Sequence, residues 1–143
     1  MKKTILCLTL IYSFFNIDID ARVLPQDVIW NNDETGYYTI DENSIVLVST
    51  IGKKDRKILS SEDVKNKKIE SFSFSQDKKN VLIFTNSVRV WRYNTRGNYW
   101  VYNLKTKQGK RLGSTLPDRS LMFAKFSPNG KKIAYVSKEI IPN

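Results

Sequence analysis

Residues 88–97 contain the side chains of this chain that are best suited to bind a ligand. The segment reads VRVWRYNTRG and places three arginines and two aromatic residues within nine positions. A guanidinium group can hold a carbonyl or a carboxylate through two parallel hydrogen bonds, and a neighbouring indole can fix its position. Taken alone, the pattern favours a structural stack of Arg92 on Trp91 over a ligand contact.

Nucleophilic hydrolysis by this chain alone is excluded by what the sequence lacks. It contains no histidine and one cysteine, Cys7, so neither a Ser-His-Asp nor a Cys-His arrangement can form. Histidine and thiolate metal sites and an internal disulfide are excluded for the same reason. Acid pairs such as Asp33-Glu34 fall at expected turns and are interpreted as solvated turn residues. We expect no catalytic residue, no metal ligand and no cofactor here.

The body of the chain is typical of an antiparallel all-β domain. Short runs rich in Val, Ile, Tyr, Phe and Thr alternate with turn residues, and no helical period is sustained past residue 22. Residues 60–65 are compatible with a single helical turn capped by Ser60 or Ser61. The expected strands cover residues 28–30, 37–40, 45–49, 57–59, 69–74, 80–85, 99–104, 110–112, 121–126 and 132–137.

One phrase of the sequence occurs twice. Residues 74–81 (FSQDKKNV) align with residues 126–133 (FSPNGKKI), each combining an aromatic residue and a serine with a tight turn, a lysine and an apolar strand. Pro128 presets φ, and Asn129-Gly130 accepts the positive φ of a hairpin turn. The two copies lie 52 residues apart. A period in the range of roughly 40–50 residues with four short strands per unit indicates a β-propeller blade.

The number of such units predicts an open, incomplete propeller of about two to three four-stranded blades. Residues 30–59 have the rhythm of a degenerate blade that precedes the complete one, and residues 137–143 stop partway through another. Because a propeller needs at least four blades to close, we expect the chain to be truncated. A small self-contained β-sandwich is the alternative fold.

The N-terminus is typical of a secretory signal peptide. Met1-Lys2-Lys3 is followed by the apolar run 4–15, by a polar stretch, and then by Ala21. The apolar run is too short for a membrane span. We therefore expect a signal peptide over residues 1–21 and export to the periplasm, the cell surface or the medium. A buried first strand is the alternative.

The formal charge of +10, from 24 basic and 14 acidic residues, requires a separate explanation. The lysines gather at turns between apolar runs, where they keep strand edges soluble. We therefore expect no nucleic-acid partner. A polyanion-binding surface remains the alternative, and its affinity would fall steeply with added salt.

Three stretches together resemble the N-terminal propeller of dipeptidyl peptidase IV, in the prolyl oligopeptidase clan of serine peptidases. They are residues 90–93 (VWRY), 99–104 (YWVYNL) and 125–135 (KFSPNGKKIAY). The last stretch is also similar to the short repeat of TolB-like propellers and by itself indicates only the fold. The resemblance covers residues 24–138 and is most specific over 88–138.

The resemblance implies a role for Arg92. In the family, the arginine of this Trp-Arg pair reaches into the active-site cavity and binds a substrate carbonyl. Arg92 is therefore the expected substrate-binding residue, and Trp91 is its supporting neighbour. The family joins the propeller to a C-terminal α/β-hydrolase domain with Ser, Asp and His, and it releases X-Pro or X-Ala dipeptides. We expect that domain and the family's amine-binding glutamate pair to lie beyond position 143.

The sequence is accordingly interpreted as the propeller part, residues 22–143, of an exported dipeptidyl peptidase IV-like serine exopeptidase. This part would position peptide substrates without being catalytic, and the family is often homodimeric. The alternative is a periplasmic TolB-like propeller that acts as a binding module and has no peptidase domain.

Overall fold

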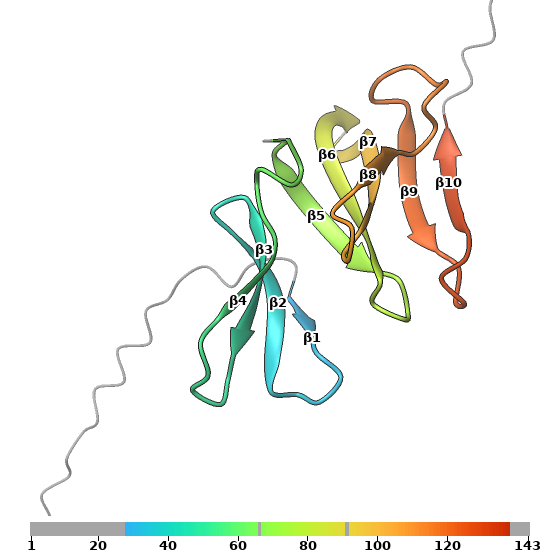
Figure 1. The fold of residues 1–143 in the computed structure, drawn as a ribbon. Coiled ribbons are helices and arrows are strands. Elements are labelled where there is room, and N and C mark those ends of the chain that lie inside the picture. Colours follow the sequence, from blue (N-terminus) through green and yellow to red (C-terminus); the bar gives the residue numbers. More distant parts are fainter. Residues whose placement is uncertain (1–27, 66, 91, 138–143) are drawn as a thin grey trace, which may run out of the picture.

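The computed structural model describes residues 28–65, 67–90 and 92–137, which form ten β-strands in two groups (Figure 1). No α-helix occurs among these residues. The all-β prediction is therefore confirmed for the part of the chain that can be described. The expected signal peptide, residues 1–21, lies outside it.

The first sheet is a simple meander. It contains β1 (Ile29–Trp30), β2 (Gly36–Asp41), β3 (Ser44–Ser49) and β4 (Arg56–Leu59), which are hydrogen-bonded in sequence order with antiparallel neighbours. This unit occupies the region expected to form a degenerate blade, and it has the four strands of a complete one.

The second sheet joins one blade to the beginning of the next. Its order is β10-β9-β7-β6-β5, and β8 pairs with β7 beside this path. The strands are β5 (Ile69–Phe74), β6 (Asn80–Val90), β7 (Tyr93–Asn103), β8 (Gly109–Arg111), β9 (Leu121–Phe126) and β10 (Ile133–Ser137). β5 to β8 form the second blade, while β9 and β10 form a hairpin that starts another.

Strand β6 lies at the centre of this blade and is covered on both faces. The five consecutive residues 81–85 are all buried, so both faces of this half of the strand contact protein. Consistent with that position, the residues are mostly large and apolar and do not alternate with polar ones. The other half of β6, from Asn86 onward, is more exposed.

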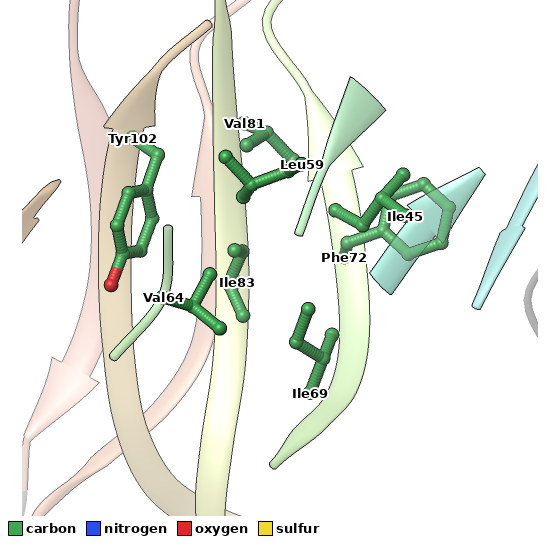
Figure 2. Packing of buried hydrophobic residues seen from close by; sticks show 8 residues of the cluster. All are labelled: Ile45, Leu59, Val64, Ile69, Phe72, Val81, Ile83 and Tyr102. Carbon is green, nitrogen blue, oxygen red and sulfur yellow. The ribbon is translucent and has the colours of Figure 1, made fainter. Parts of the chain in front are cut away.

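The main core lies between the two sheets (Figure 2). Its members come from both sheets and from the connection between them: Ile45, Leu59, Val64, Ile69, Phe72, Val81, Ile83 and Tyr102. Each buried aliphatic side chain contributes roughly 1.5–3 kcal/mol through removal of apolar surface from water. The two units are thus held together by hydrophobic packing.

The connection that delivers Val64 to this core is the expected turn at residues 60–65. The backbone N–H of Asp63 donates to the Ser60 hydroxyl over 3.2 Å, and the backbone N–H of Ser60 donates to the Asp63 carboxylate over 2.9 Å. These two reciprocal hydrogen bonds have the pattern of a capping box. Ser60, rather than Ser61, is the capping residue. The turn leaves Val64 fully buried.

The two repeated phrases form equivalent turns. Ser75 accepts the backbone N–H of Asn80 at 3.0 Å and donates to Asp77 at 2.7 Å. Ser127 accepts the backbone N–H of Lys132 at 3.0 Å and donates to Asn129 at 2.8 Å. The same side-chain bonds at corresponding positions confirm that the sequence repeat is a structural repeat.

Candidate functional site

The segment that carries Arg92 is a hairpin arm. We define the arm as residues 86–97, the parts of β6 and β7 that continue past the pair Thr85–Asn98. The strands were expected to end at residue 85 and to begin again at residue 99. They instead remain paired through Val88–Arg96 and Arg89–Asn94 as far as Val90–Tyr93. The predicted binding loop is thus mostly strand.

Arg92 lies in a turn at the tip of this arm, directly before the paired residue Tyr93. It is exposed, and the next residue, Tyr93, has 71% of its surface exposed. Arg92 lies seven positions beyond Thr85 along the chain, a span of about 20 Å for an extended strand. Trp91 lies outside the described residues. The proposed stack of Arg92 on Trp91 therefore stays a prediction.

The arm leaves the sheet at an irregularity. The register of β6 against β7 shifts between Thr85 and Val88, and Asn86 adopts a positive φ of 55°. Such a bulge bends a strand and increases its twist, and this changes the direction of the residues beyond it. The backbone N–H of Ser87 donates to the Glu70 carboxylate at 2.7 Å and ties the bend to β5.

Arg119, from the connection between β8 and β9, fastens both strands of the arm at its base. Its guanidinium donates to the Asn86 side-chain oxygen at 2.7 Å. Its backbone N–H donates to the Asn98 side-chain oxygen at 2.9 Å. Strand β9 adds two backbone pairs, Arg96–Met122 and Gly97–Leu121. The arm is therefore held by three separate parts of the chain, including β5.

Gly97 allows the base of the arm to pack closely. A Cβ at this position would lie 2.5 Å from Cε2 of Phe84 and 2.8 Å from the carbonyl oxygen of Thr85. Neither distance is compatible with ordinary van der Waals contact, and the second partner is backbone that cannot rotate away. Any larger residue would separate β7 from β6 at the point where the arm begins.

A cavity of about 450 Å³ lies beside the base of the arm, and the sequence reasoning did not anticipate it. Its lining comes from three separate stretches of the chain: Lys67, Lys68, Glu70, Thr85, Asn86, Ser87, Asn98 and Trp100. These polar residues look like ordinary turn and strand residues in the sequence, because no local pattern marks them as neighbours.

Two groups in this cavity are notable. The indole N–H of Trp100 is buried and has no hydrogen-bond partner among the described residues. The ammonium of Lys67 lies 4.3 Å from the centre of the Trp100 ring, a cation–π contact. Partial burial, together with the nearby Lys65 charge, lowers the pKa of Lys67 below its ordinary value. The base of the arm thus offers a buried donor beside a partly desolvated cation.

The arm offers groups that can bind a ligand. The arm presents a guanidinium at its tip and a phenol beside it. The described residues contain no cluster of three or more His, Cys, Asp or Glu side chains that could hold a metal ion. The guanidinium and the phenol can orient a carbonyl or carboxylate group of a ligand through hydrogen bonds.

Comparison with known proteins identifies the architecture. Residues 75–140 match the family model described as the dipeptidyl peptidase IV (DPP IV) N-terminal region. This match includes the arm, the repeated turn and the β9–β10 hairpin. The chain contains part of a dipeptidyl peptidase IV N-terminal domain. The resemblance inferred from residues 88–138 is confirmed.

Two relatives that are similar to this chain are named as peptidases. Dipeptidyl aminopeptidase B of Saccharomyces cerevisiae is 33% identical over 122 residues, covering 82% of this chain. Human prolyl endopeptidase FAP is 28% identical over 107 residues, covering 75% of this chain. The chain spans only 14% of the length of each of these relatives.

A solved structure shows the same fold. The dipeptidyl peptidase 4 of Porphyromonas gingivalis superimposes with a TM-score of 0.65 at 22% identity, over 76% of this chain and 16% of that protein. The two sheets are therefore blades of a partial β-propeller, and the β-sandwich alternative is wrong.

Proposed function

We propose that the arm positions the N-terminal dipeptide of a peptide substrate in a dipeptidyl peptidase IV-like serine exopeptidase. The observation that carries this proposal is the placement of Arg92 at the exposed tip of an arm whose base is fastened at Glu70, Arg119 and β9. A guanidinium on an arm with an anchored base can orient a peptide carbonyl through two parallel hydrogen bonds. Catalysis itself belongs to a hydrolase domain, because this chain has no histidine.

The decisive experiment measures turnover in an enzyme that contains this arm together with the remaining blades and the hydrolase domain of the yeast relative. Arg92→Ala should lower kcat/KM for X-Pro and X-Ala chromogenic substrates by about 10- to 100-fold, because the substrate carbonyl loses its orientation. The kcat/KM of Arg92→Lys should lie between the values for the wild type and Arg92→Ala, because lysine keeps the charge but cannot form the two parallel hydrogen bonds.

Lys110→Ala is the matched control for this measurement. It removes one exposed cation from β8, which is away from the arm, and should leave kcat/KM unchanged. Unchanged kinetics in Arg92→Ala would remove this residue from the substrate site. The same result would favour the alternative of a TolB-like binding module, in which no peptidase activity depends on the arm.

Export is part of the proposal. It rests on the charged and apolar pattern of residues 1–21, which is typical of a secretory signal peptide. The described residues include no helix of the length and apolar character needed to cross a bilayer. Sequencing the N-terminus of the protein recovered outside the cytoplasm tests this part, and an intact Met1 in the cytoplasmic fraction would contradict it.

A further inference from the structure

A second cavity lies at the end of the blades opposite to the arm. Its volume is about 710 Å³, within the usual range for small-molecule sites. The turns that surround it join β1 to β2, β3 to β4 and β5 to β6, and all three lie at the lower end of the sheets in Figure 1. Its lining residues are Asn31, Asn32, Asp33, Thr35, Tyr38, Leu47, Ser49, Lys53, Lys54, Arg56 and Lys78.

The charge in this cavity is strongly one-sided. Four lining residues are basic, and only one, Asp33, is acidic. In the described part of the chain, the ion pairs join Lys79 to Asp77, Lys107 to Asp63 and Arg111 to Asp118, so none involves a cation of this cavity. Concave surfaces lined by a single sign of charge concentrate counter-ions. Four cations that have no ion-pair partner among the described residues favour an anionic ligand.

The walls of the cavity are held by hydrogen bonds before any ligand arrives. The Asn31 side chain donates to the Thr35 hydroxyl at 3.1 Å and accepts the backbone N–H of Gly36 at 3.2 Å. On the other side, the Asp55 carboxylate accepts the backbone N–H of Ser49 at 2.9 Å. Asp55 is therefore engaged in its own loop. A pre-formed wall reduces the entropy lost on binding.

Lys78 has the most distinctive geometry of the four cations. It is half-buried, and its ammonium lies 5.0 Å from the centre of the Tyr38 ring in the other sheet. Its φ is +51°, a region that disfavours residues with a Cβ. The equivalent position of the second repeated turn holds Gly130, with φ +68°. Lys65 and Lys107 adopt similar positive φ angles at other turns, so it is the position of the Lys78 ammonium over Tyr38, and not its φ, that bears on this cavity.

We propose that this cavity binds a small ligand that bears a phosphate or sulfate ester. Arg56 and the three lysines supply the charge and the donors that such a tetrahedral oxyanion requires. Asn32 and Tyr38 line the same cavity and can contact the uncharged part of the ligand. The site lies at the opposite end of β6 from Arg92, so it is separate from the proposed substrate arm.

The test is calorimetric titration of the full chain with glucose 6-phosphate, glucose 6-sulfate and glucose at constant ionic strength. We expect one saturable site for the charged sugars and none for glucose. The ester that binds more tightly identifies whether the natural ligand carries a phosphate or a sulfate group. Lys78→Gly should weaken binding about tenfold through loss of a charged contact. Its melting temperature should not fall, because glycine relieves the positive φ.

Lys79→Gln is the matched control in the same turn. Lys79 is 76% exposed and pairs with Asp77 rather than lining the cavity, so affinity should change less than twofold. Arg56→Gln provides a second loss-of-binding variant in the other sheet. Absence of saturable binding by the wild-type chain would overturn the proposal. Equal weakening by Lys78→Gly and Lys79→Gln would also overturn it, because it would indicate diffuse charge attraction.

Discussion

Different contacts stabilise the chain at the two ends of strand β6. At one end, the Ser75 turn closes on itself through bonds between residues at most five positions apart. At the other end, the arm extends past the sheet and is fastened by Arg119, which lies 33 positions from its partner Asn86. The comparison shows that a turn can be specified locally, whereas an arm that presents a binding residue depends on distant segments.

The largest expected effect is at the base of the arm. Gly97→Ala should lower the free energy of unfolding by about 3 kcal/mol, because the added Cβ overlaps the Thr85 carbonyl and the Phe84 ring. Chemical denaturation measures the change. Gly52→Ala is the control, since its Cβ would meet nothing within 4 Å and only its φ of +75° is unfavourable. Equal losses would mean that close packing at Gly97 is unimportant.

The second largest effect is a loss of stability that should differ between the two repeated turns. Ser75→Ala should lower the free energy of unfolding by about 2 kcal/mol, because the backbone N–H of Asn80 loses the buried Ser75 hydroxyl as its acceptor. Ser127→Ala removes the same bonds at a more exposed site, where water can replace them, and should cost less than half as much. Denaturant melts of the two variants, compared with the wild type, test this order. Similar losses would contradict the role assigned to burial.

A smaller global effect is expected for the fastening residue. Arg119→Ala removes the exposed bond to Asn86 and should change overall stability by about 1 kcal/mol or less. Its specific result should be faster hydrogen exchange in residues 86–97, with no change at residues 75–80. Peptide-resolved exchange measured by mass spectrometry distinguishes the two ends. Uniform acceleration along β6 would show that Arg119 supports the whole blade and not the arm.

The smallest effect concerns pH. The hydroxyl of Ser75, followed by the backbone N–H of Lys79, lowers the pKa of Asp77 below its ordinary value of 3.8. A carboxyl group with a depressed pKa stabilises the fold above its unfolded pKa, and this contribution disappears as the pH falls through the folded pKa. The stability difference between the wild type and Asp77→Asn should therefore shrink below about pH 3.8. A constant difference across that range would contradict the assignment.

Much of the fold could be predicted from short stretches of the sequence. The positions of the short strands, the capped turn at Ser60 and the repeated phrase all follow from side-chain alternation and turn chemistry within a few residues. The arm was harder to predict. The consecutive polar residues Asn94, Thr95 and Arg96 give no alternating apolar pattern. Their strand conformation comes from pairing with β6 and β9.

The sequence by itself determined the class of the fold, the repeating blade, the family and the absence of a catalytic histidine, because each is a property of residue type or of spacing along the chain. Only the tertiary structure decided that Arg92 stands at the tip of a paired arm and that four cations from two sheets surround one cavity. These features depend on contacts between segments far apart in sequence, and hydrophobic packing between the sheets brings those segments together.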